Sequence, residues 1–385
     1  MVPSLCTFLT AAAALTATVH ALPQDGSGFG SSFDSTTSSF AAATASSTAS
    51  AAASTSTTAC NNSPELCGRT YNNITHMGAH DSSFLRDEST SNSIAGNQYF
   101  NATVALDAGL RLLQIQVHDQ DGVIEMCHTS CALLDAGPLE TWLGVIKSWM
   151  DANPNEVVTL LIVNSDGKDV AQFGTVFANS GIDTYGYTPS GNSWPTLQEM
   201  ISANTRLVTF IASISANTQY SYLLNEFDHV FETPFEVTDL SGFNCTLDRP
   251  TGQASAGAAV AAGLMPLMNH FKDNLLAASI MVPDADNVGI TNSPSTSTQG
   301  NLGLHAQNCN SQWGIKPTFV LVDFFNEGPA IATADTMNGI TAVGRSTAGQ
   351  TVKAVQTATA GPKPRSLGMG TGALVTFIVA ALFLA

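Results

Sequence analysis

Ile74-Thr-His-Met-Gly-Ala-His-Asp-Ser-Ser-Phe84 and Leu110-Arg-Leu-Leu-Gln-Ile-Gln-Val117 are the two stretches that decide the fold. Each contains a short run of apolar and β-branched residues, which is typical of a strand buried on both faces of a parallel sheet. Three later runs have the same character. We therefore expect five strands of one sheet, at Ile74–Ala79, Leu110–Val117, Val157–Val163, Leu207–Ala212 and Thr318–Phe324.

A helix is predicted between the second and third strands, at Pro138–Asn153 (PLETWLGVIKSWMDAN). Leu139, Trp142, Leu143 and Ile146 recur at helical spacing, with a proline at the start and another directly after the final asparagine. Alternation of strands and helices predicts an α/β fold. No Gly-x-Gly-x-x-Gly turn follows the first strand, which counts against a dinucleotide-binding sheet.

We favour a TIM-type (β/α)8 barrel, regular or distorted, because the segment 60–345 suits one barrel domain, which typically takes roughly 250 residues. Strands five to seven are not placed. The segment 252–303, where some of them are expected, is rich in Ala, Gly, Ser, Thr and Asn and shows no clear period.

The N-terminal part of the chain is not expected to belong to this domain. Residues 1–21 read as a signal peptide, because the apolar run Leu5–Val19 is followed by small residues suited to cleavage, although no basic residue precedes it. Residues 22–59 consist mostly of Ser, Thr, Ala and Gly and have little to bury. We expect them to form a disordered, O-glycosylated stalk.

The C-terminal part predicts a glycolipid anchor. Residues 346–371 read as a linker and polar spacer with small residues at Ala358-Thr-Ala360, and 372–385 (GALVTFIVAALFLA) as an apolar tail. This tail is shorter than the roughly 20 residues of a spanning helix. A buried C-terminal helix is the alternative. We expect a secreted protein at the cell surface, anchored in the plasma membrane or the wall.

Cysteines and glycosylation motifs agree with secretion. Of seven cysteines, six remain once Cys6 leaves with the signal peptide, and an even number suits disulfides. Six cysteines allow fifteen pairings. We prefer the two pairs that are close in sequence together with one long closure, and no pattern suggests zinc. The preferred pairs are Cys60 with Cys67, Cys127 with Cys131 and Cys245 with Cys309, and the acceptor motifs start at Asn61, Asn73 and Asn101.

The net charge restricts the partners. With 13 Lys and Arg against 30 Asp and Glu, the formal charge is -17 at pH 7. Such a surface repels polyanions, so nucleic acid is not an expected partner. General electrostatic attraction to an anionic membrane is equally disfavoured. If the protein acts on lipid, the anchor supplies proximity.

Two histidines mark the candidate site. His80-Asp81 ends the first strand, and His128 lies beyond the second strand, after an excursion that contains the hairpin signal Asp121-Gly122. In barrels of this kind the catalytic residues lie at the C-terminal ends of the strands. Asp323 lies among apolar residues of the last strand, which neighbours the first in a closed barrel. Because histidine titrates near neutral pH, one imidazole can accept a proton while another donates one.

These features resemble the phosphatidylinositol-specific phospholipase C superfamily and its X-domain barrel, in the style of secreted, anchored fungal members. The resemblance rests on His80-Asp81, the segment that starts at Gly109-Leu-Arg, His128, Asn153-Pro-Asn-Glu156 before the third strand, and Val322-Asp323-Phe-Phe. It covers residues 71–163 well, returns near Asp323 and is thin between them.

The resemblance implies roles for four residues. His80 would act as general base on the inositol hydroxyl next to the phosphate, so that this oxygen attacks phosphorus within the same molecule. His128 would protonate the leaving glycerol oxygen. Asp323 would orient His80, and Asp81 would do the same for His128. The substrate would be an inositol phospholipid or glycolipid.

The chain departs from the superfamily where charge on the phosphate is neutralised. The second strand carries Gln114 and Gln116 in place of charged residues, and with a period of two His118 shares their face. Amides donate hydrogen bonds but supply no full charge, and calcium prefers carboxylate oxygens. We therefore expect no metal and no other cofactor. His118 or Lys272 could supply the lost positive charge as substrate-binding residues.

Two hypotheses compete because of these glutamines. One is an active phosphodiesterase that uses paired histidines, and the other is a catalytically weak or inactive surface-binding or wall protein with the same barrel. A metal-dependent phosphodiesterase that acts on choline or glycerol esters is a third. A serine hydrolase is disfavoured, because no Gly-x-Ser-x-Gly elbow is present.

Overall fold

The computed structural model describes residues 58–347, except residues 192, 216, 278 and 279. The predicted signal peptide (1–21), the stalk (22–59) apart from its last two residues, the spacer (346–371) apart from its first two, and the apolar tail (372–385) lie outside the described residues. Within the described part, no helix has both the length and the apolar character needed to cross a membrane.

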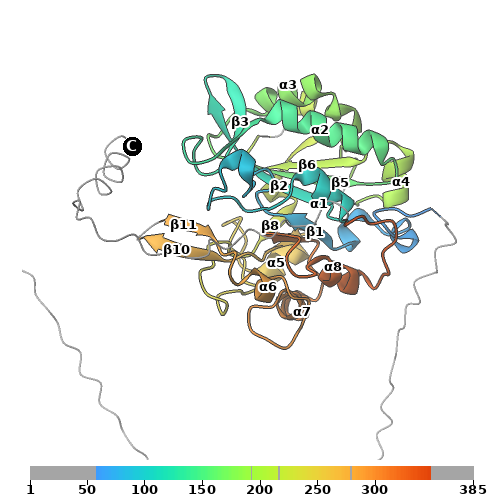
Figure 1. Cartoon of the computed structure of the whole chain (residues 1–385). Coiled ribbons are helices and arrows are strands. Elements are labelled where there is room, and N and C mark those ends of the chain that lie inside the picture. Colours follow the sequence, from blue (N-terminus) through green and yellow to red (C-terminus); the bar gives the residue numbers. More distant parts are fainter. Residues whose placement is uncertain (1–57, 192, 216, 278–279, 348–385) are drawn as a thin grey trace, which may run out of the picture. The chain divides into compact units, whose positions relative to one another are not determined.

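Eight parallel strands form the main sheet (Figure 1). Their order is β7-β6-β5-β2-β1-β12-β9-β8. All five predicted strands are present, with ends that differ by at most three residues. The bounds are β1 His76–Ala79, β2 Leu112–Gln120, β5 Val158–Asn164, β6 Leu207–Ile211, β7 Leu223–Asn225, β8 Val230–Glu232, β9 Met265–Asn269 and β12 Phe319–Val322.

The barrel is distorted and open. The last strand pairs with the first as expected, with Ala79 of β1 opposite Val322 of β12. The expected full closure is not found, because no backbone pairing joins the end strands β7 and β8 within the described residues. Both strands have only three residues, so a ladder between them could hold few hydrogen bonds. The fold remains a curled α/β barrel of the predicted class.

Helices cover the outside of the strands. The predicted helix is confirmed as α2 Leu139–Ala152, whose buried residues include Leu139, Leu143 and Ile146. In Figure 1, α2, α3 and α4 lie along one flank of the strands and α5 to α8 along the other. The other helices are α1 Ala102–Asp107, α3 Val170–Ser180, α4 Leu197–Ser202, α5 Ala256–Ala261, α6 Val288–Thr291, α7 Leu302–Trp313 and α8 Ile331–Asn338.

Short 3-10 helices complete the connections between these elements. They lie at Pro64–Leu66, Tyr71–Asn73, Glu88–Thr90, Ile182–Tyr185, Thr218–Tyr220 and Glu226–Asp228.

Two hairpins extend the fold beyond the barrel. β3 Val123–Cys127 pairs antiparallel with the end of β2, and β4 Asp135–Pro138 pairs with β3. The turn between β2 and β3 is the predicted Asp121-Gly122, where both residues have positive φ, 52° and 91°. The second hairpin, β10 Asp273–Ala277 with β11 Ile280–Pro283, forms a separate two-stranded sheet that was not predicted.

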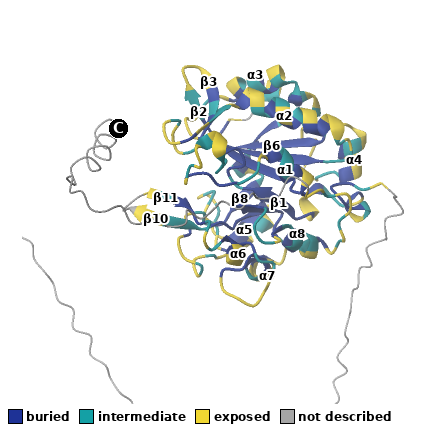
Figure 2. Ribbon diagram, in the orientation of Figure 1, coloured by how far each residue is buried: buried dark blue, intermediate teal, exposed yellow. Residues whose placement is uncertain are grey.

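The core has two layers because strand residues alternate between two buried faces. Along β5, Leu160 and Ile162 belong to the cluster that contains Ile146 of α2 and Phe173 of α3. Leu161, between them, belongs to a second cluster that fills the barrel with residues such as Leu321. Figure 2 shows the strands as the buried centre of the fold. This double burial explains why the strand sequences read as continuous apolar runs.

The three preferred disulfides are all present: Cys60–Cys67, Cys127–Cys131 and Cys245–Cys309. One acceptor motif is not available for glycosylation in the folded chain. The side chain of Asn61 is buried, and its amide bonds both backbone groups of Val157. Asn73 and Asn101 are exposed and stay candidates for glycosylation.

We expect the Cys245→Ala/Cys309→Ala variant to lose about 4 kcal/mol of the free energy of unfolding, because this disulfide spans 64 residues and restricts the unfolded chain most. The Cys60→Ala/Cys67→Ala variant, which opens a span of 7 residues, should lose about 2 kcal/mol. Urea unfolding of both variants measures the difference. Equal losses would contradict the loop-entropy explanation.

Candidate active site

A pocket of about 430 Å³ opens at the C-terminal ends of the parallel strands. Its lining comes from the ends of β1, β2, β5, β8, β9 and β12 and from the base of the β10–β11 hairpin. His80, Asp81, His128, Gln114 and Gln116 all line it. Five of the eight residues that the sequence singled out therefore line one pocket.

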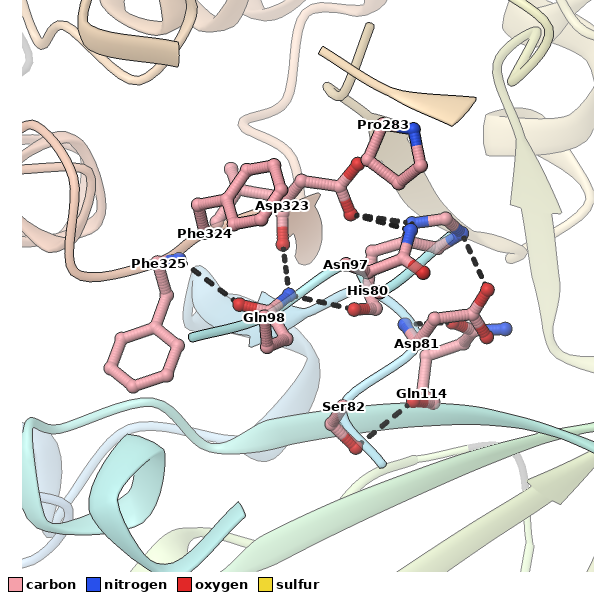
Figure 3. A network of polar contacts seen from close by, with 12 residues as sticks. His80, Asp81, Ser82, Asn97, Gln98, Gln114, Pro283, Asp323, Phe324 and Phe325 are labelled. Atoms are coloured by element: carbon pink, nitrogen blue, oxygen red, sulfur yellow. Dashed lines mark hydrogen bonds and ion pairs between the residues drawn. The ribbon is translucent and has the colours of Figure 1, made fainter. Parts of the chain in front are cut away.

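His80 is held by Asp323 from the neighbouring strand (Figure 3). Its Nδ1 lies 2.8 Å from Oδ1 of Asp323, and the Asn97 amide donates to the same oxygen over 3.1 Å. Phe271 stacks on the imidazole, with ring centroids 3.6 Å apart. A carboxylate that accepts from Nδ1–H selects the tautomer in which Nε2 is free to accept a proton. Asp323 thus has the orienting contact that was predicted for it.

Gln98 ties the ends of the two strands together. Its amide donates to the backbone oxygens of His80 and Val322, over 2.7 and 3.1 Å, and its side-chain oxygen accepts from the Phe325 backbone (Figure 3). Gln98 is fully buried. Asn97 and Gln98 were missed because they lie in a loop whose sequence carries no periodic signal.

Asp81 stands between the two histidines. Its Oδ2 lies 3.7 Å from Nε2 of His80 and 3.5 Å from Nε2 of His128. The residue has a positive φ of 45°, and its backbone N–H donates to the Gln114 side-chain oxygen over 2.6 Å. Because one carboxylate oxygen neighbours both ring nitrogens, the two imidazoles face a common space in the pocket.

The loop after β3 positions His128. The Cys127–Cys131 disulfide closes this loop, and the His128 backbone N–H donates to the Leu134 oxygen over 3.0 Å. The ring meets Phe84 edge to face, with centroids 5.1 Å apart. The hairpin excursion of β2 and β3 therefore returns His128 to the barrel mouth, as the sequence suggested.

Electrostatics favour a charged His80. Burial by itself lowers the pKa of an imidazole, but the charges of Asp81 and Asp323, the hydrogen bond to Asp323 and the charge of Asp273 together raise the pKa of His80 to about 9. Asp273 is affected in turn. Burial and the charge of Asp323 raise its pKa to about 7.

The two glutamines of β2 present amide groups to the pocket. The side-chain oxygen of Gln114 accepts from the Asp81 backbone, and that of Gln116 accepts from the Thr129 backbone over 2.6 Å. Among the described residues, no hydrogen bond uses either NH₂ group. These groups are therefore the donors that the strand offers to a ligand.

His118 and Lys272 do not line the pocket. Beyond Val117, β2 leaves β5 and continues into the hairpin with β3, which carries His118 to a hydrogen bond with Asp166, 2.9 Å away. The ammonium of Lys272 is bound by the buried Asp284 at 2.7 Å. The structure therefore gives no support to the predicted substrate-binding role of these two residues.

A buried pair of carboxyl groups, of which Glu232 lines the pocket, was missed. Glu226 follows β7 and Glu232 ends β8, so the pair bridges the two strands that no backbone pairing joins. Burial and the charge of Glu232 raise the pKa of Glu226 well above its usual value, so Glu226 keeps its proton and donates a hydrogen bond to the Glu232 carboxylate. Glu232 also binds Arg249 and accepts from Asn269. Single glutamates next to strands of only three residues belong to no recognisable sequence motif.

The pocket has little free positive charge. Arg249 is the sole lysine or arginine among the described lining residues, and Glu232 neutralises it. The pocket carboxylates are not gathered as metal ligands. In the described part of the chain, the single group of three close donors is Cys245, His305 and Cys309, whose cysteines form a disulfide. The donor set does not suit calcium, which takes six to eight oxygens.

The protein is thus a parallel α/β barrel with two imidazoles at the C-terminal ends of its strands, which form a candidate acid–base site. The PI-PLC X family model matches residues 66–338, and the chain belongs to this family. The resemblance inferred from the sequence motifs is thereby confirmed.

The first of the following relatives also supports this membership. The chain is 41% identical over 286 residues to PI-PLC X domain-containing protein 1 of Arthroderma benhamiae, covering 73% of this chain and 89% of that protein. It is 36% identical over 297 residues to a protein of the same fungus named as an uncharacterized secreted protein, covering 74% and 65%. The phosphatidylinositol-specific phospholipase C of Listeria monocytogenes aligns with 71% of this chain and 94% of its own, at a TM-score of 0.48 and 13% identity.

We expect Asp323→Asn to lower the pKa of His80 from about 9 by roughly one to three pH units, because the variant removes an adjacent negative charge. Titration of the imidazole by NMR measures this. Asp166→Asn is the matched control, since Asp166 pairs with His118 outside the pocket. A His80 pKa that is the same in both variants would exclude Asp323 as its partner.

Proposed function

We propose that the chain is a phosphodiesterase of the phospholipase C type that cleaves inositol phospholipids or glycolipids. The observation that carries this proposal is the oxygen of Asp81 that neighbours Nε2 of both His80 and His128. A base and an acid on two sides of one space are what an in-line displacement at phosphorus requires.

In the proposed reaction, Nε2 of His80 takes the proton from the inositol hydroxyl next to the phosphate. The resulting oxygen attacks phosphorus and forms a cyclic phosphodiester. The bond from phosphorus to the glycerol oxygen breaks, and His128 donates its proton to that leaving oxygen. Attack within one molecule avoids the entropic cost of bringing in a second reactant, and each positioned acid or base contributes roughly 10²- to 10⁴-fold.

Neutral donors would hold the phosphate oxygens. The NH₂ groups of Gln114 and Gln116 come from one strand face in the pocket, and their orientation is set by the Asp81 and Thr129 backbones. The imidazole of His128, which carries the proton that it later donates, supplies the remaining positive charge. The proposed arrangement uses no metal.

A binding protein without turnover is the second candidate. It is favoured by the neutralised Arg249 and by the apolar wall at the end of β5, where Leu161 and Val163 line the pocket. Such a site can accept a lipid headgroup yet stabilise a transition state poorly, since transition-state charge needs strong donors.

Secretion and anchoring belong to the same proposal. One relative is named as a secreted protein, and the three disulfides suit an oxidising compartment. We keep the glycolipid anchor at the C-terminus as the attachment to the plasma membrane or the wall.

We expect the purified protein to release soluble inositol phosphate from phosphatidylinositol vesicles in the presence of chelator. His80→Ala and His128→Ala should each lower kcat by roughly 10²- to 10⁴-fold, because each removes a proton-transfer group. His118→Ala is the matched control and should retain activity. Background rates from the wild type and all variants would favour the binding protein, and loss of activity in chelator would favour a metal-dependent enzyme.

We expect Asp273→Asn to raise kcat/KM severalfold at pH 8 and to change it little at pH 6. At pH 8 Asp273, with a pKa of about 7, is ionised and stabilises the charged form of His80, which cannot act as a base. At pH 6 its carboxyl is already protonated, so the amide replaces a neutral group. Steady-state rates at both pH values test this, and a ratio that does not change with pH would contradict it.

A further inference from the structure

A fourth glycosylation motif lies in the connection between β8 and α5. Asn244-Cys-Thr246 fits the pattern Asn-x-Ser/Thr, in addition to the motifs that start at Asn61, Asn73 and Asn101. Its middle residue is a cysteine, which the other three motifs lack. Asn244 and Thr246 are exposed, whereas the side chain of Asn61 is buried. The folded chain therefore has room for a sugar at Asn244 and none at Asn61.

The Asn244 side chain is held by its own motif. Its oxygen accepts from the Thr246 backbone N–H over 3.0 Å and from the Thr246 hydroxyl. Its NH₂ group donates to the Gly242 backbone oxygen over 3.0 Å, and among the described residues it makes no other hydrogen bond. One amide hydrogen is thus left for replacement by a sugar, while the contacts of the oxygen do not depend on it.

The backbone of the motif is fixed to one face of α7. His305, Cys309 and Trp313 are buried, and because they recur every four residues they share one side of the helix. The His305 Nε2 donates to the Asn244 backbone oxygen over 3.0 Å. Cys309 forms the disulfide with Cys245, and the Trp313 indole donates to the Cys245 oxygen over 2.9 Å. An enzyme that binds the motif along its backbone therefore has to act before α7 docks.

The order of synthesis leaves an interval for this. Cys309 follows Cys245 by 64 residues, which takes roughly 3 to 13 s at about 5–20 residues per second. Disulfide formation then adds seconds or more. Asn61 differs, because it lies between Cys60 and Cys67, which are 7 residues apart and are made within roughly 1 s of each other. Asn244 is thus free of its disulfide for longer than Asn61.

The surroundings of Asn244 suit a neutral carbohydrate. Asn244 lines a cavity of about 130 Å³ together with Gln299, Asn308, Gln312 and the ring of Phe243. No acidic residue, lysine or arginine is among the described residues of this lining. Side-chain amides both donate and accept hydrogen bonds, as the hydroxyl groups of a sugar do. A sugar on Asn244 would therefore meet partners of matching chemistry.

We propose that Asn244 carries an N-linked glycan, which is added before α7 docks and before Cys245 pairs with Cys309. The inference rests on the secretory route of the proposed function, since the sugar donor is a lipid-linked oligosaccharide diphosphate of that route. The bond from the first sugar carbon to the diphosphate oxygen breaks, and a bond from that carbon to Nδ2 of Asn244 forms. The displaced amide proton leaves with the diphosphate.

The site is tested with the full chain in a fungal secretory host. Asn244→Gln and Thr246→Ala should each lose one glycan, measured as one step in electrophoretic mobility and as an unmodified peptide in mass spectrometry. Thr246→Ser keeps the motif and is the matched control, which should keep the glycan. Cell extract and medium are both analysed, so that a variant that folds poorly still reports its modification.

Two results separate this proposal from the secretory route. An unmodified Asn244 in wild-type chain that is secreted, or that carries sugar at Asn73 or Asn101, would overturn the proposal and leave the route intact. A chain that stays inside the host without sugar at any motif would overturn both. Asn61 should be unmodified in the same digest, and sugar at Asn61 would contradict the explanation by timing.

The order of events is tested on chain made while synthesis of the lipid-linked sugar is inhibited. This protein, with the Cys245–Cys309 disulfide closed, is incubated with microsomal oligosaccharyltransferase and its donor. We expect no addition at Asn244 in the folded, oxidised chain and addition after reduction and unfolding. Equal addition to both forms would overturn the proposed order. No addition to the reduced, unfolded chain would overturn the site itself.

Discussion

The parallel pairing of β12 with β1 is the contact on which the candidate site depends. It joins residues 243 positions apart and places Asp323 beside His80. Gln98 adds hydrogen bonds to both strand ends, so the pairing and the imidazole are held by the same buried group. A strand register is strongly specified when both faces are buried, because a shift by one residue would turn Asp323 away from the imidazole. The geometry of the proposed base is therefore a consequence of sheet packing.

A surplus of carboxylates sets the chemistry of the pocket. Asp81 and Asp273 act on His80 in addition to Asp323, while Glu232 neutralises the lining Arg249. Positive charge in the pocket thus resides mainly on imidazole, whose protonation depends on pH. The same acidity disfavours attraction to anionic surfaces.

Much of the fold could be predicted from local patterns. The five apolar runs, the helix at Pro138–Asn153 and the Asp121-Gly122 turn depend on residues close in sequence, and the structure contains all of them. Strands β7 and β8 were not predicted, because strands of three residues are too short to show a period. Strand β9 was not predicted because it lies in the segment 252–303, which shows no clear period. His118 was misplaced for a related reason, since a period of two does not show where β2 leaves the barrel.

The sequence by itself determined much of the strand and helix pattern and the family motif around His80-Asp81, because each is written in neighbouring residues. For the disulfides it supported only a preference among fifteen pairings. Only the tertiary structure decided that Asp81 lies between both histidines, that Glu226 and Glu232 bridge the open edge of the barrel, and that the β10–β11 hairpin stands exposed beside the pocket. These depend on which distant segments meet and on what remains uncovered when they do. Burial and long-range contact are properties of the whole packed chain.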